Sequence, residues 1–101
     1  MRLTAEQIVA IKETAGKHFG KGASVRLFGS RADDSRRGGD IDLYITTDLP
    51  DVEKIIKAEI QFLAELKRRI GDQKIDVLVD YPARKRHPPI FTVARETGIP
   101  L

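Results

Sequence analysis

The chain has 101 residues, 41% hydrophobic and 33% charged, which predicts a single globular domain over residues 1–101. A count of 18 lysines and arginines against 15 aspartates and glutamates gives a formal charge of +3, too mild to indicate direct nucleic-acid binding. The absence of cysteine excludes disulfides and thiolate metal sites, and no apolar run suits a signal peptide or a membrane span. We therefore expect a cytoplasmic protein without membrane contact.

The first predicted element is a helix over residues 5–19. Thr4 and Gln7 have the spacing of a capping box, in which each side chain bonds to the other residue's backbone N–H. Gly20 and Gly22 provide the stop at the other end. Four apolar residues recur on one helical face: Ile8, Ile11, Ala15 and Phe19.

Alternating apolar and polar residues predict three strands, over residues 24–28, 40–46 and 75–80. In the second strand one face is apolar and the other carries Asp40 and Asp42. The third strand alternates in the same way and carries Asp76. Carboxylates should therefore gather on one face of a sheet whose other face is apolar.

Two further helices complete the predicted fold. The longer follows Pro50 and ends at Gly71, with an apolar stripe at helical spacing, and the shorter covers residues 90–97. This order predicts the α/β (α+β) class, as a two-layer sandwich. A small mixed β-sheet would carry the helices on one face and the carboxylates on the other.

The three aspartates are the candidate metal ligands. Residues i and i+2 of a strand point the same way, about 6.5–7 Å apart, so Asp40 and Asp42 face one volume. Such a pair either retains a proton or binds a divalent cation, and an exposed strand end favours the cation. With Asp76, the set could hold two metal ions of the kind that assist displacement at phosphorus.

The segment after the first strand is the candidate phosphate site. Gly29 lets the backbone approach a ligand closely, and Ser30 can cap the following turn. Arg31, Arg36 and Arg37 add positive charge to the same loop. Backbone N–H groups, arginines and metal could therefore share the charge of a triphosphate.

Other polar residues admit two interpretations. Tyr44 lies on the carboxylate face and either lines a nucleotide site or packs in the fold. Arg26 shares that face and could pair with the carboxylates, whereas His18, beside the end of the first helix, is expected to be structural. The basic run at residues 84–87 is either a solvated loop or a contact for phosphate or a partner.

One motif resembles a known family. The segment LFGSRADDSRRGGDIDLYI contains Gly29 and Ser30, nine intervening residues and then Asp40 and Asp42. This spacing resembles the signature of the polymerase-beta-like nucleotidyltransferase superfamily, and Asp76 in KIDVLVD matches its third carboxylate. At this length the chain is most similar to the minimal nucleotidyltransferase (MNT) group. One departure is Gly39, where the family often has serine before the first aspartate.

The resemblance implies a specific function. MNT proteins are commonly antitoxins of HEPN-domain ribonuclease toxins, and some transfer AMP from ATP onto a toxin tyrosine. It implies Mg²⁺ or Mn²⁺ held by the three aspartates, and a triphosphate held by Gly29, Ser30 and Arg31. The alternative is a non-catalytic binding module that neutralises a toxin by masking its active site.

Overall fold

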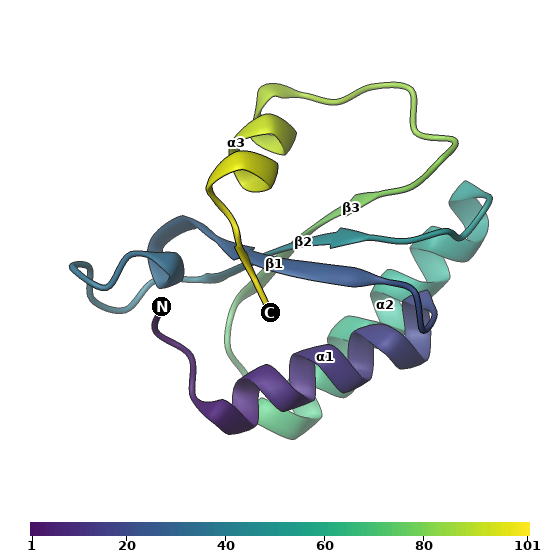
Figure 1. Cartoon of the computed structure of the whole chain (residues 1–101). Helices are drawn as coiled ribbons and strands as arrows, with labels where there is room; N and C mark the ends of the chain where they lie inside the picture. Colours follow the sequence, from purple (N-terminus) through teal and green to yellow (C-terminus); the bar gives the residue numbers. More distant parts are fainter.

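The computed structural model describes all residues from 1 to 101 and confirms the α+β class. The chain forms three helices, a short 3₁₀ turn and four strands (Figure 1). In chain order they are α1 (Ala5–Phe19), β1 (Ser24–Phe28), η1 (Gly29–Ala32), β2 (Ile41–Thr46), α2 (Val52–Ile70), β3 (Ile75–Asp80), α3 (Pro89–Thr97) and β4 (Ile99–Pro100). None of the helices has the length and apolar character needed to cross a bilayer.

The four strands form one mixed sheet in the order β3-β2-β1-β4. β1 runs antiparallel to both β2 and β4, whereas β2 and β3 are parallel. Parallel neighbours need a long crossover, which α2 provides. The register places Asp42 of β2 opposite Asp76 of β3 on one side and opposite Phe28 of β1 on the other. The starts of β2 and β3 therefore meet the end of β1.

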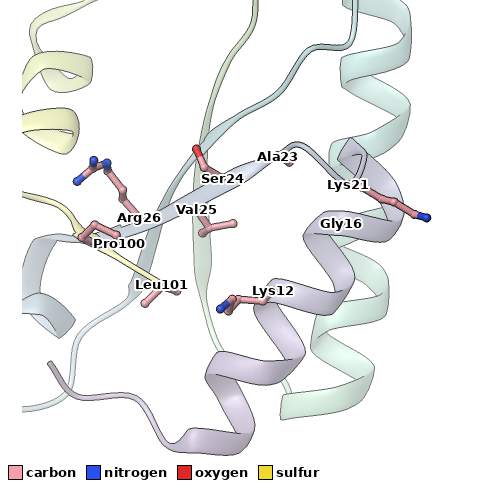
Figure 2. Close-up of a pocket in the computed structure, with 9 residues that line it drawn as sticks. All are labelled: Lys12, Gly16, Lys21, Ala23, Ser24, Val25, Arg26, Pro100 and Leu101. Atoms are coloured by element: carbon pink, nitrogen blue, oxygen red, sulfur yellow. The ribbon is translucent and has the colours of Figure 1, made fainter.

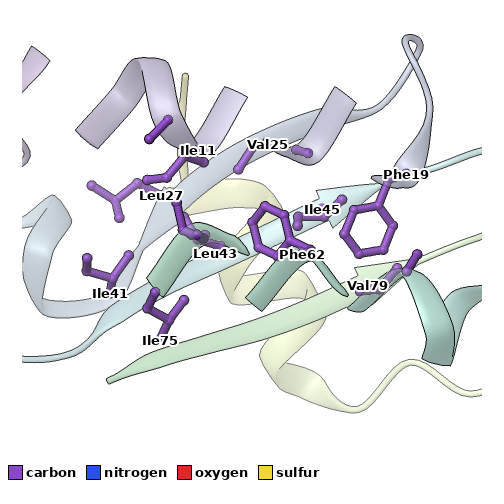
Figure 3. Packing of buried hydrophobic residues seen from close by; sticks show 14 of the residues in the cluster. Ile11, Phe19, Val25, Leu27, Ile41, Leu43, Ile45, Phe62, Ile75 and Val79 are labelled. Atoms are coloured by element: carbon purple, nitrogen blue, oxygen red, sulfur yellow. The ribbon is translucent and has the colours of Figure 1, made fainter. Parts of the chain in front are cut away.

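The main core lies between the sheet and the pair α1 and α2, which cover the same face (Figure 1). Fifteen buried residues form it, and Figure 3 shows side chains of the strands meeting those of both helices. Phe19 of α1 and Phe62 of α2 pack edge to face with ring centroids 5.5 Å apart. The predicted capping box of Thr4 and Gln7 is present at the start of α1.

The third helix differs in position from the other two. α3 lies on the opposite face of the sheet, above β1 and β2 in Figure 1. A second cluster holds it there, made of Phe28, Tyr44, Phe91 and Ala94. The predicted placement of the helices on one face of the sheet therefore holds for α1 and α2. The face that carries the carboxylates is covered in part by α3. In this cluster α3 packs on Phe28 and Tyr44.

The observed boundaries of the helices and of β1, β2 and β3 agree with the predicted ones to within one or two residues. β2 begins at Ile41, one residue after the predicted start, so Asp40 lies just outside the strand. β4 was not predicted, because two residues that include Pro100 are too short to show a period. It pairs with β1 and returns the C-terminal segment to the sheet.

Candidate active site

The three aspartates lie at one end of the sheet, where β2 and β3 begin. Asp42 and Asp76 are opposite each other in the parallel register, and Asp40 precedes Asp42 by two residues. Asp76 is exposed and Asp42 is half-buried. Strand pairing thus places Asp42 opposite Asp76, and Asp40 lies two residues before Asp42, but the three side chains are not gathered as a ready metal site.

The electrostatics of this cluster are unfavourable for negative charge. Burial raises the pKa of the Asp42 carboxyl above its ordinary value, and the nearby carboxylates of Asp76 and Asp40 raise it further. Lys74 opposes this effect, and its Nζ lies 3.4 Å from Oδ2 of Asp40. Sequence analysis missed Lys74, although its position two residues before Asp76 is a signal for the same face of the strand.

Gly29 connects the turn after β1 to the carboxylates. Its φ of 72° lies in the left-handed region, and a Cβ built on it would overlap the Asp42 carboxylate, with Cγ 3.1 Å away. The backbone after β1 therefore passes directly against Asp42. The segment from Gly29 to Ala32 forms a single 3₁₀ turn, not the start of an α-helix.

Arg31 is held by the chain itself. Its Nε donates to the carbonyl of Gly39 (3.1 Å), Nη1 to the carbonyl of Arg2 (3.0 Å) and Nη2 to Oε1 of Gln73 (3.2 Å). These bonds use three directions of the guanidinium group and shape the loop between β1 and β2. The exposed cations of that loop are Arg36 and Arg37.

The structure decides several of the alternative interpretations. Tyr44 is buried, and its hydroxyl donates to Oδ2 of Asp80 (3.0 Å) while its ring packs on Phe91. Packing is therefore its role in the fold. Arg26 does not pair with the carboxylates, since its Nη1 donates to the carbonyl of Gly98 (3.1 Å). His18 contacts Glu65 of α2 at 3.1 Å and is structural, as expected.

The basic run at residues 84–87 is partly ordered by the fold. The Nε of Arg84 donates to the carbonyl of Val79 (3.0 Å), and its guanidinium lies 4.5 Å from the centre of the Phe91 ring. His87 contacts Oδ1 of Asp80 at 2.9 Å. Both ends of the basic run thus contact β3, while Lys85 and Arg86 between them are exposed.

The candidate site is an open surface. None of the hollows in the protein is lined by the three aspartates or by Gly29. A hollow of about 340 Å³ lies between α1, β1 and the C-terminal segment, and its cations are Lys12, Lys21 and Arg26. Lys21 and Arg26 point away from each other (Figure 2). The start of β2 and β3 is therefore an open surface without an enclosing pocket.

The donor set suits a hard divalent cation. Carboxylate oxygens are the ligands of Mg²⁺ and Mn²⁺. The pKa of Asp42 is raised first by burial and then by the carboxylates of Asp76 and Asp40, whose negative charge a cation would neutralise. No group of three or more histidine, aspartate or glutamate side chains is already gathered closely enough to hold a metal. Mg²⁺ commonly takes one or two carboxylates and completes its shell with water and phosphate oxygens, which fits this arrangement.

Comparison with known proteins agrees with this geometry. Residues 8–97 match the family described as the nucleotidyltransferase domain, so the match covers most of the chain. No curated protein matches the chain. The matched span includes the turn at Gly29 and all three aspartates at the start of β2 and β3. The chain therefore belongs to the nucleotidyltransferase domain family.

Proposed function

We propose that this nucleotidyltransferase is the antitoxin of a HEPN-type ribonuclease toxin and transfers AMP from ATP to a toxin tyrosine. Membership of the family implies a transferase that uses a nucleoside triphosphate and, typically, a divalent metal. The observation that carries the proposal is the contact of Gly29 with Asp42, which lies opposite Asp76. It joins a backbone turn suited to phosphate with carboxylates suited to metal. We propose that residues 1–101 act as one domain.

Each residue has a role in this scheme. Asp40 and Asp42 would hold Mg²⁺ or Mn²⁺, and Asp76 would contribute to a second metal and orient or deprotonate the acceptor hydroxyl. The metal, when bound, would neutralise phosphate charge. Gly29 and Ser30 would bind the triphosphate through backbone N–H groups and the serine hydroxyl. The new bond joins the tyrosine oxygen to the α-phosphorus, pyrophosphate leaves, and the phenolic proton passes to solvent or to Asp76.

Arg31 would act on the triphosphate indirectly. Its three hydrogen bonds to the chain hold the loop that follows Ser30. We propose that its positive charge adds to the potential of the phosphate site while its side chain keeps this position. Arg36 and Arg37 are the exposed cations of the same loop. We propose that they contact the outer phosphates.

The openness of the site supports a protein acceptor. A small domain without a hollow at its carboxylates offers little surface to enclose a small acceptor, so the acceptor must bring its own binding surface. Ile90 and Val93 of α3 are 43% and 48% exposed, on the face of the sheet that carries the carboxylates. We propose that the toxin docks on the segment from 84 to 101.

Mass spectrometry of a co-expressed toxin tests the proposal. Transfer should add about 329 Da to the toxin per AMP, the net gain when an adenylyl group replaces a hydroxyl hydrogen in the displacement. Asp42→Asn should abolish the addition, and Asp48→Asn, an exposed aspartate beyond the far end of β2, should retain it. A toxin that stays unmodified yet is fully inhibited by wild type and Asp42→Asn alike would support the binding module instead.

A further inference from the structure

The side chain of Arg2 ties together three points of the loop between β1 and β2. Its Nη2 donates to the carbonyls of Ser30 (2.8 Å) and Gly38 (2.7 Å), and its Nε donates to the carbonyl of Asp33 (3.2 Å). These three carbonyls span the loop from the turn after β1 to the residues before β2. Figure 1 shows the N-terminal segment rising from α1 to reach this loop.

Arg2 and Arg31 also hold each other. The backbone N–H of Arg2 donates to the carbonyl of Arg31 (2.8 Å), and Nη1 of Arg31 donates to the carbonyl of Arg2 (3.0 Å). Nη2 of Arg31 continues to Gln73, three residues before Asp76. The two arginines therefore link the N-terminal segment, the loop and the start of β3. We call this pair the arginine brace.

The loop has few other bonds of its own. Gly38 and Gly39 have φ values of 61° and 90°, and glycines lose the most conformational freedom when they are fixed. Within residues 33–39 the only bonds from one backbone group to another run from Asp33 to Ser30 and from Arg36 to Asp33, and the Ser35 N–H donates to Oδ1 of Asp33 (2.9 Å). A planar guanidinium can hold several carbonyls at fixed angles, which a lysine ammonium cannot do.

We propose that Arg2 is a positioning residue for the nucleotide site. Its side chain bonds to backbone carbonyls of the loop, and it acts by holding the Ser30 carbonyl so that Gly29 and Ser30 stay against Asp42. Fixing this turn before ATP binds reduces the ordering cost of binding. The role rests on the proposed function of the same site, and no sequence pattern indicates it.

Calorimetric titration with Mg·ATP tests the role of Arg2. Arg2→Ala should weaken binding about tenfold, because the free loop must be ordered each time ATP binds. Arg2→Lys keeps the charge but reaches fewer carbonyls, so this variant should lose less Mg·ATP affinity than Arg2→Ala. Arg69→Ala is the matched control, since it also removes one arginine charge but lies in a surface pair with Glu13. Its Mg·ATP affinity should equal that of the wild type.

Hydrogen exchange separates positioning from general stability. Arg2→Ala should speed the exchange of backbone amides within residues 29–39 and leave those of α2 unchanged, and saturating Mg·ATP should restore protection. In the transfer assay the variant should have a raised KM for ATP and a nearly unchanged kcat. If Arg2 only stabilised the fold, its loss would lower the melting temperature and increase exchange throughout the protein. It would not raise KM for ATP while leaving kcat nearly unchanged.

The outcomes distinguish this inference from the proposed function. If the wild type binds Mg·ATP and Arg2→Ala binds it equally well, the positioning role is overturned while the nucleotidyltransferase site stands. Equal exchange of residues 29–39 in both proteins would overturn it in the same way. If the wild type binds no Mg·ATP, both the proposed function and the positioning role fail.

Discussion

Gly39 lies so close to the side chain of Ser30 that a Cβ at position 39 would stand 3.0 Å from the Ser30 Cβ and overlap its hydroxyl. The φ of Gly39 is 90°, which L side chains rarely adopt. At position 39 the family often has serine, and here a glycine suits the site because the Ser30 side chain occupies the space of a Cβ. In this chain the glycine leaves the space that Ser30 fills, and Ser30 is one of the three residues expected to bind the triphosphate, with Gly29 and Arg31.

The first prediction concerns this contact. Gly39→Ala should weaken Mg·ATP binding about tenfold or more, because the new methyl group displaces the Ser30 side chain from the site. Gly38→Ala is the matched control, since Gly38 also has a positive φ but a methyl group there would meet no atom within 4 Å. Calorimetry should show a smaller loss for the control. Equal losses would mean that backbone strain, and not the contact with Ser30, controls the affinity.

The second prediction concerns the stability of Asp42→Asn. The folded-state pKa of Asp42 is raised by burial and by Asp76 and Asp40, so its ionised form destabilises the fold. This penalty is complete above the raised folded pKa and disappears as the pH falls to the unfolded value of about 3.9. Without metal, the variant should therefore melt above the wild type at pH 7 and equal it in acid.

Thermal denaturation across pH, with and without Mg²⁺, checks this difference. Added Mg²⁺ should stabilise the wild type more than Asp42→Asn, since the ligand is lost in the variant. Asp48→Asn should show neither effect. A large loss of stability in Asp42→Asn at pH 7 would make this aspartate a structural residue.

Strand alternation was sufficient to predict the shared face of Asp42 and Asp76. Period two placed Asp42 and Asp76 on the polar faces of their strands, and the parallel register puts them opposite each other. The same rule, applied to Lys74, would have found the cation beside Asp40. These positions could be predicted because they depend only on the local sequence and on the pairing of adjacent strands.

Long-range contacts of single residues could not be predicted in this way. Arg2 bonds to residues 28 to 36 positions away, and no local period marks such a contact. The sequence also could not predict which face of the sheet α3 covers, because Phe91 could pack equally well into an apolar cluster on either face. It packs above β2 since Phe28 and Tyr44 supply an apolar patch on the polar face.

The third prediction is that ATP binding depends on a divalent metal. A triphosphate beside Asp40, Asp42 and Asp76 would otherwise add negative charge to a site where burial, and then the carboxylates of Asp76 and Asp40, already raise the pKa of Asp42. Calorimetry should show ATP binding with Mg²⁺ or Mn²⁺ and at least about tenfold weaker binding after EDTA. Tight binding that is indifferent to EDTA would rule out a metal-bridged site.

The fourth prediction concerns Asp80. Burial raises the pKa of this carboxyl, but hydrogen bonds from His87 and Tyr44 outweigh burial and hold the pKa below its ordinary value. Its contribution to stability is therefore present above the unfolded pKa of about 3.9 and is lost as the pH falls through the lowered folded value. Asp80→Asn should cost about 1 kcal/mol at pH 6 and little at pH 2. Thermal denaturation measures the difference, and a cost that does not change with pH would assign it to packing alone.

The last prediction compares two buried threonines. Thr14 of α1 is 0% exposed and its hydroxyl has no hydrogen-bond partner, whereas Thr47 is 2% exposed and donates to the carbonyl of Phe19 (2.6 Å). Valine has nearly the same shape as threonine, so Thr14→Val removes an unpaired polar group and should stabilise the fold by about 1 kcal/mol. Thr47→Val leaves the Phe19 carbonyl without its donor and should destabilise the fold by about 1–2 kcal/mol. Urea denaturation measures both, and a loss of stability in Thr14→Val would mean that its hydroxyl is bonded in solution.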